Sequence, residues 1–364
     1  MRCGSRLFPW AVVWGLLIAP GECLPPAAAC PACVGTAGPE LSFVQQVVNC
    51  DIAVCALPTE DRRRFALHSC FKGAGPPGGE IVLPVAELPQ GRLPRDRQVL
   101  LGREALTQRW KFLGTVAAGH AEWLLAIGKM QRTAALSAAD WTERSRFFLG
   151  TLATDEPLIR DTLVRELSRT PYAVMRACRA DLDVDRLLQT LDPDKFPERR
   201  ALVALLLGIA GGPTAETWLA KVRSEAAGRR EDPARAALLV AQLEQAGVAG
   251  LPGFLRSEIL EVSLRESERR AALLALSVQG TAEGVIPRPA VVAVYERILE
   301  QRPELADMVA TDLADWNEAS LVGPLQRVLD AGAATDGARE RIARALEVIH
   351  SRRQSSENDR PPAK

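Results

Sequence analysis

The sequence has little of what a nucleic-acid-binding or phosphate-binding protein depends on. It holds three histidines among 364 residues, and its 45 basic side chains are balanced by 45 acidic ones. This balance argues against a nucleic-acid-binding protein, which needs a net basic face. The glycine-rich stretch 73–79 contains no lysine and no helix is expected after it, so we interpret it as a loop and not as a phosphate cradle.

Long apolar runs are also scarce. The run at residues 10–18, WAVVWGLLI, is too short to cross a bilayer, which takes about 20 residues. Arg2 and Arg6 precede this run and the small residues 27–29 follow it, which is typical of a signal peptide. We therefore predict that residues 1–29 are a signal peptide and that the mature chain is secreted or periplasmic, with no transmembrane segment.

Five cysteines are crowded into about 40 residues. They are Cys30, Cys33, Cys50, Cys55 and Cys70. Clustered cysteines in an oxidising compartment indicate disulfides, and an odd number leaves one thiol free or paired elsewhere. A lipid anchor on Cys30, tethering the chain to the cell envelope, would account for the odd cysteine. Cys30-Pro-Ala-Cys33 is also compatible with a redox dithiol, but it lacks the second cysteine pair of a zinc site, so no metal is expected.

The segment 30–115 is predicted to be a small, disulfide-tied β-domain, either a sheet or a barrel. Residues 50–57 and 63–71 read as two strands joined by a turn near Glu60, followed by strands at 80–88 and 97–102. This turn would place Cys50 opposite Cys70. It would also place Ala53, Cys55 and Leu57 on one face with Phe65 and Leu67.

From residue 119 to 350 the chain is rich in alanine, leucine, arginine and glutamate, with apolar residues at helical spacing. Segments beginning near Glu198, Pro233 and Glu268 superimpose, with weaker echoes at Pro303 and Asp336. A repeat of this length, two helices to a unit, predicts a HEAT-like α-solenoid, since one helix pair cannot bury its own apolar stripe. Residues 351–364 are polar and are expected to be disordered. The predicted fold class is therefore α+β, in two domains.

One repeated position carries charge. Arg200, Arg235 and Arg270 are spaced 35 residues apart, and each is followed by alanine. Equivalent positions of a solenoid line up along one surface. These three arginines either pair with neighbouring acids or form a basic ridge that binds a partner. We take them as the partner-binding candidates.

The order of the segments in this chain resembles that of a group of uncharacterised exported bacterial proteins. The resemblance rests on CxxC, VVNCDIAVCAL, FKG, EIVLP, VLLG and ERRALVALLLGIAG. It implies a short β-domain followed by HEAT-like helices. Separately, CxxC leading into strands that end in Phe71-Lys72-Gly73 is similar to the netrin-like module of metalloproteinase inhibitors, an OB-type barrel. That module opens with Cys-x-Cys, whereas this chain has Cys30-x-x-Cys33.

Catalytic signatures are missing. His120-Ala-Glu122 has the His-x-Glu of zinc deaminases without the Pro-Cys-x-x-Cys that must follow it. We therefore expect no enzyme and no cofactor. The favoured hypothesis is an exported scaffold that binds an unidentified protein or cell-envelope component through its helical repeats. The alternative is a netrin-like inhibitor or CxxC redox module carried by a helical domain.

Overall fold

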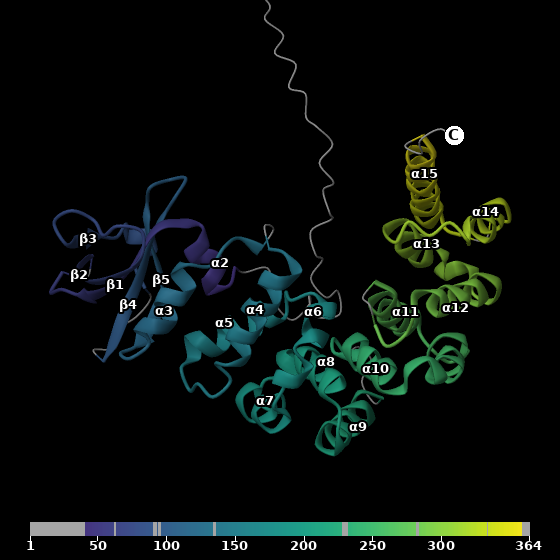
Figure 1. Cartoon of the computed structure of the whole chain (residues 1–364), viewed down its shortest axis with the longest axis horizontal. Coiled ribbons are helices and arrows are strands. Elements are labelled where there is room, and N and C mark those ends of the chain that lie inside the picture. Colours follow the sequence, from purple (N-terminus) through teal and green to yellow (C-terminus); the bar gives the residue numbers. More distant parts are fainter. Residues whose placement is uncertain are drawn as a thin grey trace, which may run out of the picture.

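The computed structural model describes residues 41–358, except 62, 90–92, 94, 95, 134, 135, 228–231, 282, 283 and 333. The predicted signal peptide, Cys30 and Cys33 lie outside these residues. A small antiparallel sheet at the N-terminal side is followed by a long array of helices (Figure 1). The predicted α+β class with a two-part layout is confirmed.

The sheet has five antiparallel strands in the order β3-β2-β1-β4-β5. They are β1 (Cys50–Pro58), β2 (Arg64–Lys72), β3 (Glu80–Val82), β4 (Arg97–Glu104) and β5 (Trp110–Ala117). The sheet is open, with β3 and β5 at its edges. The strand expected at 80–88 is only three residues long, because Pro84 lacks the backbone N–H that a strand ladder needs and a short 3-10 turn, η1 (Val85–Glu87), follows it.

The register of the first hairpin differs from the prediction. Cys70 lies opposite Val54, whereas Cys50 pairs with Glu104 on β4. The loop is closed by the Thr59 N–H, which donates to the Arg64 carbonyl oxygen at 3.1 Å, so the turn centres beyond Glu60. Two irregularities in the β1–β2 ladder, each typical of a β-bulge, then shift the pairing further.

The same irregularities change the faces of the sheet. Phe65 and Leu67 pack with Val54 and Ala56, on the face opposite the one that Cys55 shares with the helices. The prediction that Phe65 and Leu67 share a face with Cys55 was therefore wrong. The helix-side face is covered by α2 (Phe43–Val48) and α3 (Ala121–Gly128), which join it to the main core.

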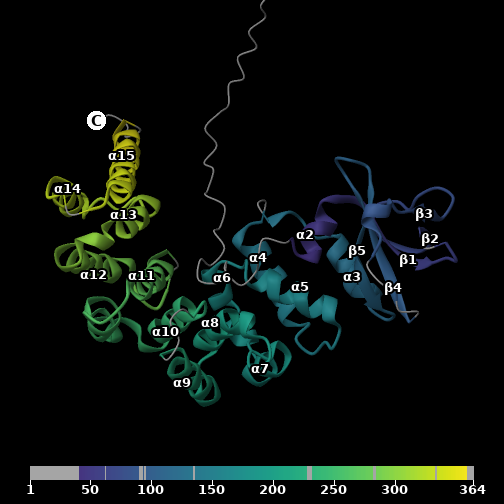
Figure 2. The ribbon, with the colours of Figure 1, turned by 180° about the vertical axis from the view of Figure 1, so that it is seen from behind.

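The remaining helices form two rows that bend into an arc (Figure 1). The inner row consists of α4 (Ala138–Leu149), α6 (Tyr172–Ala177), α8 (Arg200–Ala210), the first part of α10 (Arg235–Phe254), α11 (Glu266–Thr281), α13 (Ala306–Asp315) and α15 (Asp336–Asn358). The outer row consists of α5 (Pro157–Leu167), α7 (Val184–Leu191), α9 (Pro213–Ala227), the π-helical segment η5 (Leu255–Leu260), α12 (Arg288–Gln301) and α14 (Val322–Asp330). Helices pack on their neighbours within each row, and most also pack on the next helix in sequence. The view from behind shows the same arc (Figure 2).

Side chains one repeat apart are in contact along the inner row. Three hydrogen bonds join residues separated by 35 positions: Gln279 to Glu244 at 3.5 Å, Ser277 to Asp312 at 2.7 Å, and Trp316 to Thr281 at 3.0 Å. The spacing equals that of Arg200, Arg235 and Arg270. From α10 through α11 to α13, consecutive inner helices are therefore stacked with the 35-residue spacing of the sequence repeat.

Two glycines turn the chain from the inner to the outer row. Gly211 follows α8 with φ 71° and ψ −170°, and Gly247 interrupts α10 with φ 59° and ψ −159°. This region of backbone space is essentially restricted to glycine. Residues 235–260 have the length and hydropathy of a membrane-spanning helix, but half of the apolar window is buried. The break at Gly247 makes this stretch two core helices of one repeat.

The glycine break gives a first prediction. Gly247→Ala should lower the free energy of unfolding by about 1–3 kcal/mol, because alanine is strained in this conformation. Its Cβ would also lie 3.3 Å from Cγ1 of Val285. The matched control is Gly253→Ala, in the helical part that follows, where a Cβ meets no atom within 4 Å. The control should be neutral or stabilising by up to about 1 kcal/mol. Equal urea-unfolding midpoints for the two variants would contradict the assignment.

The C-terminal end also differs from expectation. Helix α15 runs to Asn358, through residues that were expected to be disordered. Extending an existing helix is much easier than nucleating one, so polar residues with good helix propensity can continue it without burial. Arg352 further fixes this part by donating from Nη1 to the Ala314 carbonyl oxygen at 2.6 Å.

Candidate functional site

The three candidate arginines do not form a row of free cations. Arg200 is buried, its Nε donates to the Pro193 carbonyl oxygen at 3.1 Å, and its Nη1 lies 3.5 Å from Oε2 of Glu225. Arg235 and Arg270 are more exposed than Arg200 but also pair with acids of this chain. All three guanidinium groups therefore have carboxylate partners within the protein.

Two of these ion pairs connect consecutive inner helices. Arg235 on α10 lies 3.2 Å from Glu268 on α11, and Arg270 on α11 lies 3.7 Å from Asp307 on α13. Arg265 and Arg235 hold the pKa of Glu268 at about 2, so this carboxylate stays charged. Charge reversal of these arginines would break contacts between repeats and so change stability together with any binding.

All four described cysteines are free thiols: Cys50, Cys55, Cys70 and Cys178. The disulfides expected among Cys50, Cys55 and Cys70 are therefore not found in the described part of the chain. Burial raises the pKa of the Cys50 and Cys55 thiols, which disfavours the reactive thiolate. The pairing of Cys30 with Cys33 stays a prediction, since both lie outside the described residues.

A pocket of about 540 Å³ lies between α3 and α4, where the sheet domain meets the inner row. We call it the α3–α4 pocket. Its apolar wall is formed by Leu125 on α3, Met130 and Leu136 in the connection, and Phe147 on α4. Leu125 is 46 % exposed, one of the few large apolar side chains so open to solvent among the described residues. Pockets of this volume are typical of ligand-binding sites.

Charged groups surround this apolar wall. Glu122, Asp140 and Glu143 line the pocket as carboxylates, and Lys129 lines it as a cation. Ser137 donates to Asp140 from its hydroxyl and its backbone N–H, which lowers the pKa of that carboxyl. Neither Glu122 nor Glu143 forms an ion pair with another residue in the described part of the chain.

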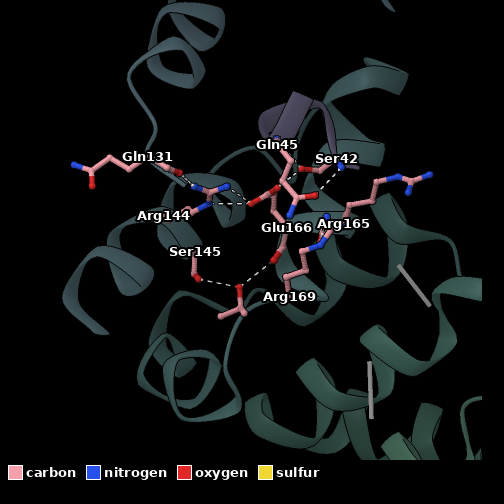
Figure 3. Close-up of polar contacts among 9 residues, drawn as sticks. Ser42, Gln45, Gln131, Arg144, Ser145, Arg165, Glu166 and Arg169 are labelled. Carbon is pink, nitrogen blue, oxygen red and sulfur yellow. Dashed lines mark hydrogen bonds and ion pairs between the residues drawn. The ribbon is translucent and has the colours of Figure 1, made fainter. Parts of the chain in front are cut away.

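The base of the pocket is a buried ion pair. Arg144, which also lines the pocket, donates from Nε and Nη2 to Oε2 of Glu166 on α5 at 2.8 and 2.5 Å (Figure 3). Its Nη1 donates to the Gln131 carbonyl oxygen at 3.1 Å. The Ser42 hydroxyl, at the N-terminus of α2, donates to Oε1 of Glu166. Arg144 is therefore fully engaged, and Glu166 connects α2, α4 and α5.

A second buried carboxylate joins the sheet to the helices. Glu156 caps the N-terminus of α5, accepts a hydrogen bond from the Ala117 N–H at 3.0 Å and pairs with Arg97 of β4. Burial opposes ionisation of Glu156, but the hydrogen bonds from Arg97 and from backbone N–H groups outweigh it and lower the pKa. Glu156 and Glu166 thus attach the sheet and α2, respectively, to the two ends of α5.

Polar groups are also buried between inner helices farther along the arc. Glu244 accepts hydrogen bonds from the Tyr172 hydroxyl at 2.6 Å and from Nε of Arg176 at 2.9 Å, which links α6 to α10. The Gln279 side chain donates from α11 to the same tyrosine oxygen at 3.3 Å. Burial and the Glu244 charge raise the pKa of Tyr172, so its hydroxyl stays protonated and remains a donor.

Another acid, Asp312, is half-buried between α11, α12 and α13. Asp312 accepts hydrogen bonds from the Tyr295 and Ser277 hydroxyls. Burial raises the pKa of Asp312 to about 6, despite these hydrogen bonds, and the negative charge of Asp315 adds to the shift. Trp316 stacks on Tyr295 with ring centroids 5.7 Å apart. Asp312 therefore titrates within the physiological pH range.

None of these groups has the arrangement of a catalytic site. His120 is the N-cap residue of α3, but its side chain makes no capping hydrogen bond. Nδ1 of His350 interacts with the Leu346 carbonyl oxygen. No three described His, Cys, Asp or Glu side chains lie close enough together to hold a metal ion. The α3–α4 pocket offers an apolar surface beside Glu122 and Glu143, which form no ion pair with another described residue.

Sequence reasoning did not identify this pocket. Glu122 was considered only as part of a His-x-Glu pattern, and Leu125, Glu143 and Phe147 were not singled out. A signal was nevertheless present, because Leu125 departs from the buried face that Trp123, Leu124 and Ile127 define.

Comparison with family models, with curated proteins and with solved structures gives no match.

Proposed function

We propose that this chain is an exported binding protein, in which a HEAT-like α-solenoid offers its inner row of helices to a protein partner at the cell envelope. The observation that carries the proposal is the 35-residue register between inner helices, seen in hydrogen bonds such as Ser277 to Asp312. Helix pairs that stack in register form an extended surface, and repeat proteins use such surfaces for binding.

The side chains left exposed on the inner-row helices support this reading. Gln245 on α10, Thr281 on α11, and Thr311 and Asp315 on α13 are exposed, and all are small or polar. They are not needed to fill the core. Polar side chains of this kind suit a surface that meets a partner reversibly.

The sheet domain and α15 support the same interpretation, because solenoid ends need a cover for their open apolar faces. At the N-terminal end, α2 and the sheet pack on α5, and Arg97–Glu156 fixes the contact. At the C-terminal end, α15 packs on α13 and turns a largely polar face outward. In this proposal the apolar faces at both ends of the solenoid are covered, and the partner contacts the inner row.

The test is copurification of partners from envelope extracts under mild conditions. The wild-type chain is compared with variants that carry new lysines on either the inner or the outer row. The inner-row variant is Gln245→Lys with Asp315→Lys. The matched control is Glu216→Lys with Glu296→Lys, exposed positions on α9 and α12 of the outer row. The proposal expects a defined protein to be retained by the wild-type chain and by the control, and to be lost by the inner-row variant.

Two results would contradict the proposal. One is equal retention of the partner by both variants. The other is no defined partner in any extract. Circular dichroism and the unfolding midpoint of each variant show that loss of binding is not loss of folding, since exposed substitutions of this kind change stability by about 0.5 kcal/mol or less.

A further inference from the structure

The α3–α4 pocket combines two features that the fold itself does not require. Leu125, on the apolar wall of the pocket, is 46 % exposed. It is not needed to attach α3 to the core, because Trp123, Leu124 and Ile127 form the buried face of that helix. Across the opening, Phe147 on α4 is only partly buried. An apolar side chain placed between Leu125 and Phe147 would remove both from water, which is the principal driving force for association.

Charge around the opening selects among apolar ligands. Glu122 and Glu143, both exposed, face the pocket from α3 and α4, with Asp140 one turn before Glu143. Among the described residues, Lys129 is the only cation that lines the pocket besides Arg144. Because Glu166 neutralises Arg144, the opening carries an excess of negative charge. A ligand with basic groups beside its apolar group is favoured, and an acidic one is repelled.

The chain's own N-terminal residues are a poor match for this site. The stretch 30–40, CPACVGTAGPE, leads into α2 but contains no basic side chain and ends in glutamate. Its charge has the wrong sign for Glu122 and Glu143. A segment of another protein is the better match.

We propose that the α3–α4 pocket binds a short peptide segment of the partner, in which an apolar side chain such as leucine or phenylalanine is flanked by basic residues. The apolar side chain contacts Leu125, Met130 and Phe147, and the flanking cations lie against Glu122 and Glu143. The buried Arg144–Glu166 pair holds α4 and α5 together and so fixes the wall that carries Phe147 and Glu143. This proposal rests on the binding role proposed above and assigns the chemistry of the segment that is bound.

The experiment measures the fluorescence anisotropy of labelled peptides with the full chain. The probe is Arg-Gly-Leu-Phe-Gly-Arg, compared with Glu-Gly-Leu-Phe-Gly-Glu and Arg-Gly-Ser-Ser-Gly-Arg. We expect the first peptide to bind at least about tenfold more tightly than either comparison peptide. This ratio corresponds to a difference of about 1.4 kcal/mol in binding free energy. The affinity should fall as salt is raised, because exposed charges are screened.

Variants locate the binding. Glu122→Lys with Glu143→Lys should weaken binding of the basic peptide by at least about tenfold and improve binding of the acidic one. Leu125→Ser should weaken both peptides that contain leucine and phenylalanine. Glu216→Lys with Glu296→Lys, on the outer row, serves as the control and should leave all affinities unchanged. All of these positions are exposed, so the variants should fold.

The proposal is overturned if the three peptides bind alike, if none binds, or if the pocket variants bind as the wild type does. Tighter binding after removal of the residues before Leu41 would show that the chain's own segment occupies the pocket, and would also overturn it. The two proposals fail separately. A partner that is retained by the wild type and lost by the inner-row variant, with no peptide binding, leaves the binding role intact and refutes only the assignment of the pocket.

Discussion

Replacing Arg144 with methionine is expected to lower the free energy of unfolding by about 3–5 kcal/mol, the usual cost of leaving one member of a buried ion pair without its partner. Glu166 is 1 % exposed and would lose both hydrogen bonds from Arg144 while keeping the one from the Ser42 hydroxyl. Burial leaves the carboxylate little contact with solvent that could replace the guanidinium. Urea unfolding followed by circular dichroism measures the loss.

Two companion variants separate this effect from the loss of a long side chain. Arg344→Met removes an arginine from an exposed pair with Glu340, in which both side chains are 72 % exposed, and should cost about 1 kcal/mol or less. Arg144→Met combined with Glu166→Leu removes both buried charges and should regain most of the lost stability. If the double variant is no more stable than Arg144→Met alone, the uncompensated charge is not the cause.

The repeat was the part of the fold most open to prediction from sequence. Arg200, Arg235 and Arg270 recur because each inner helix buries the same face against the same kind of neighbour, and that face sets a fixed spacing. Each of these arginines pairs with carboxylates of its own chain, and Arg235 and Arg270 reach acids on the next inner helix. Local periodicity thus predicted which residues are equivalent, and the structure shows what each of them contacts.

Features that depend on contacts between distant residues were not accessible in the same way. The irregular pairing that moves Cys70 opposite Val54 arises where β1 is held between β2 and β4, and no composition signal marks it. Arg144 and Glu166 are 22 positions apart on different helices. In sequence they resemble any exposed pair of charges, so neither their burial nor the pocket above them could be inferred.

Raising the pH from 4 to 7 is expected to destabilise the protein through Asp312. Its pKa is about 6 in the folded chain and 3.8 in the unfolded one, so between these values the folded state binds more protons and stability falls as pH rises. The full contribution is about 3 kcal/mol, present below pH 4 and lost above pH 6. The groups that face this carboxyl are the Tyr295 and Ser277 hydroxyls, which do not titrate here, and Asp315.

Asp312→Asn isolates this contribution from the other acids. Asparagine keeps an oxygen that can accept a hydrogen bond from Tyr295 or Ser277 but cannot ionise. The difference in unfolding free energy between variant and wild type should therefore grow by about 2–2.5 kcal/mol, in favour of the variant, between pH 4 and pH 7. Taking the difference cancels carboxylates such as Asp51, whose pKa of about 2 gives the opposite slope. Asp315→Asn, at an exposed neighbour, is the control and should change the slope much less. A variant with the same pH dependence as the wild type would show that the pKa of Asp312 is not raised in the folded protein. Its hydrogen bonds would then offset its burial.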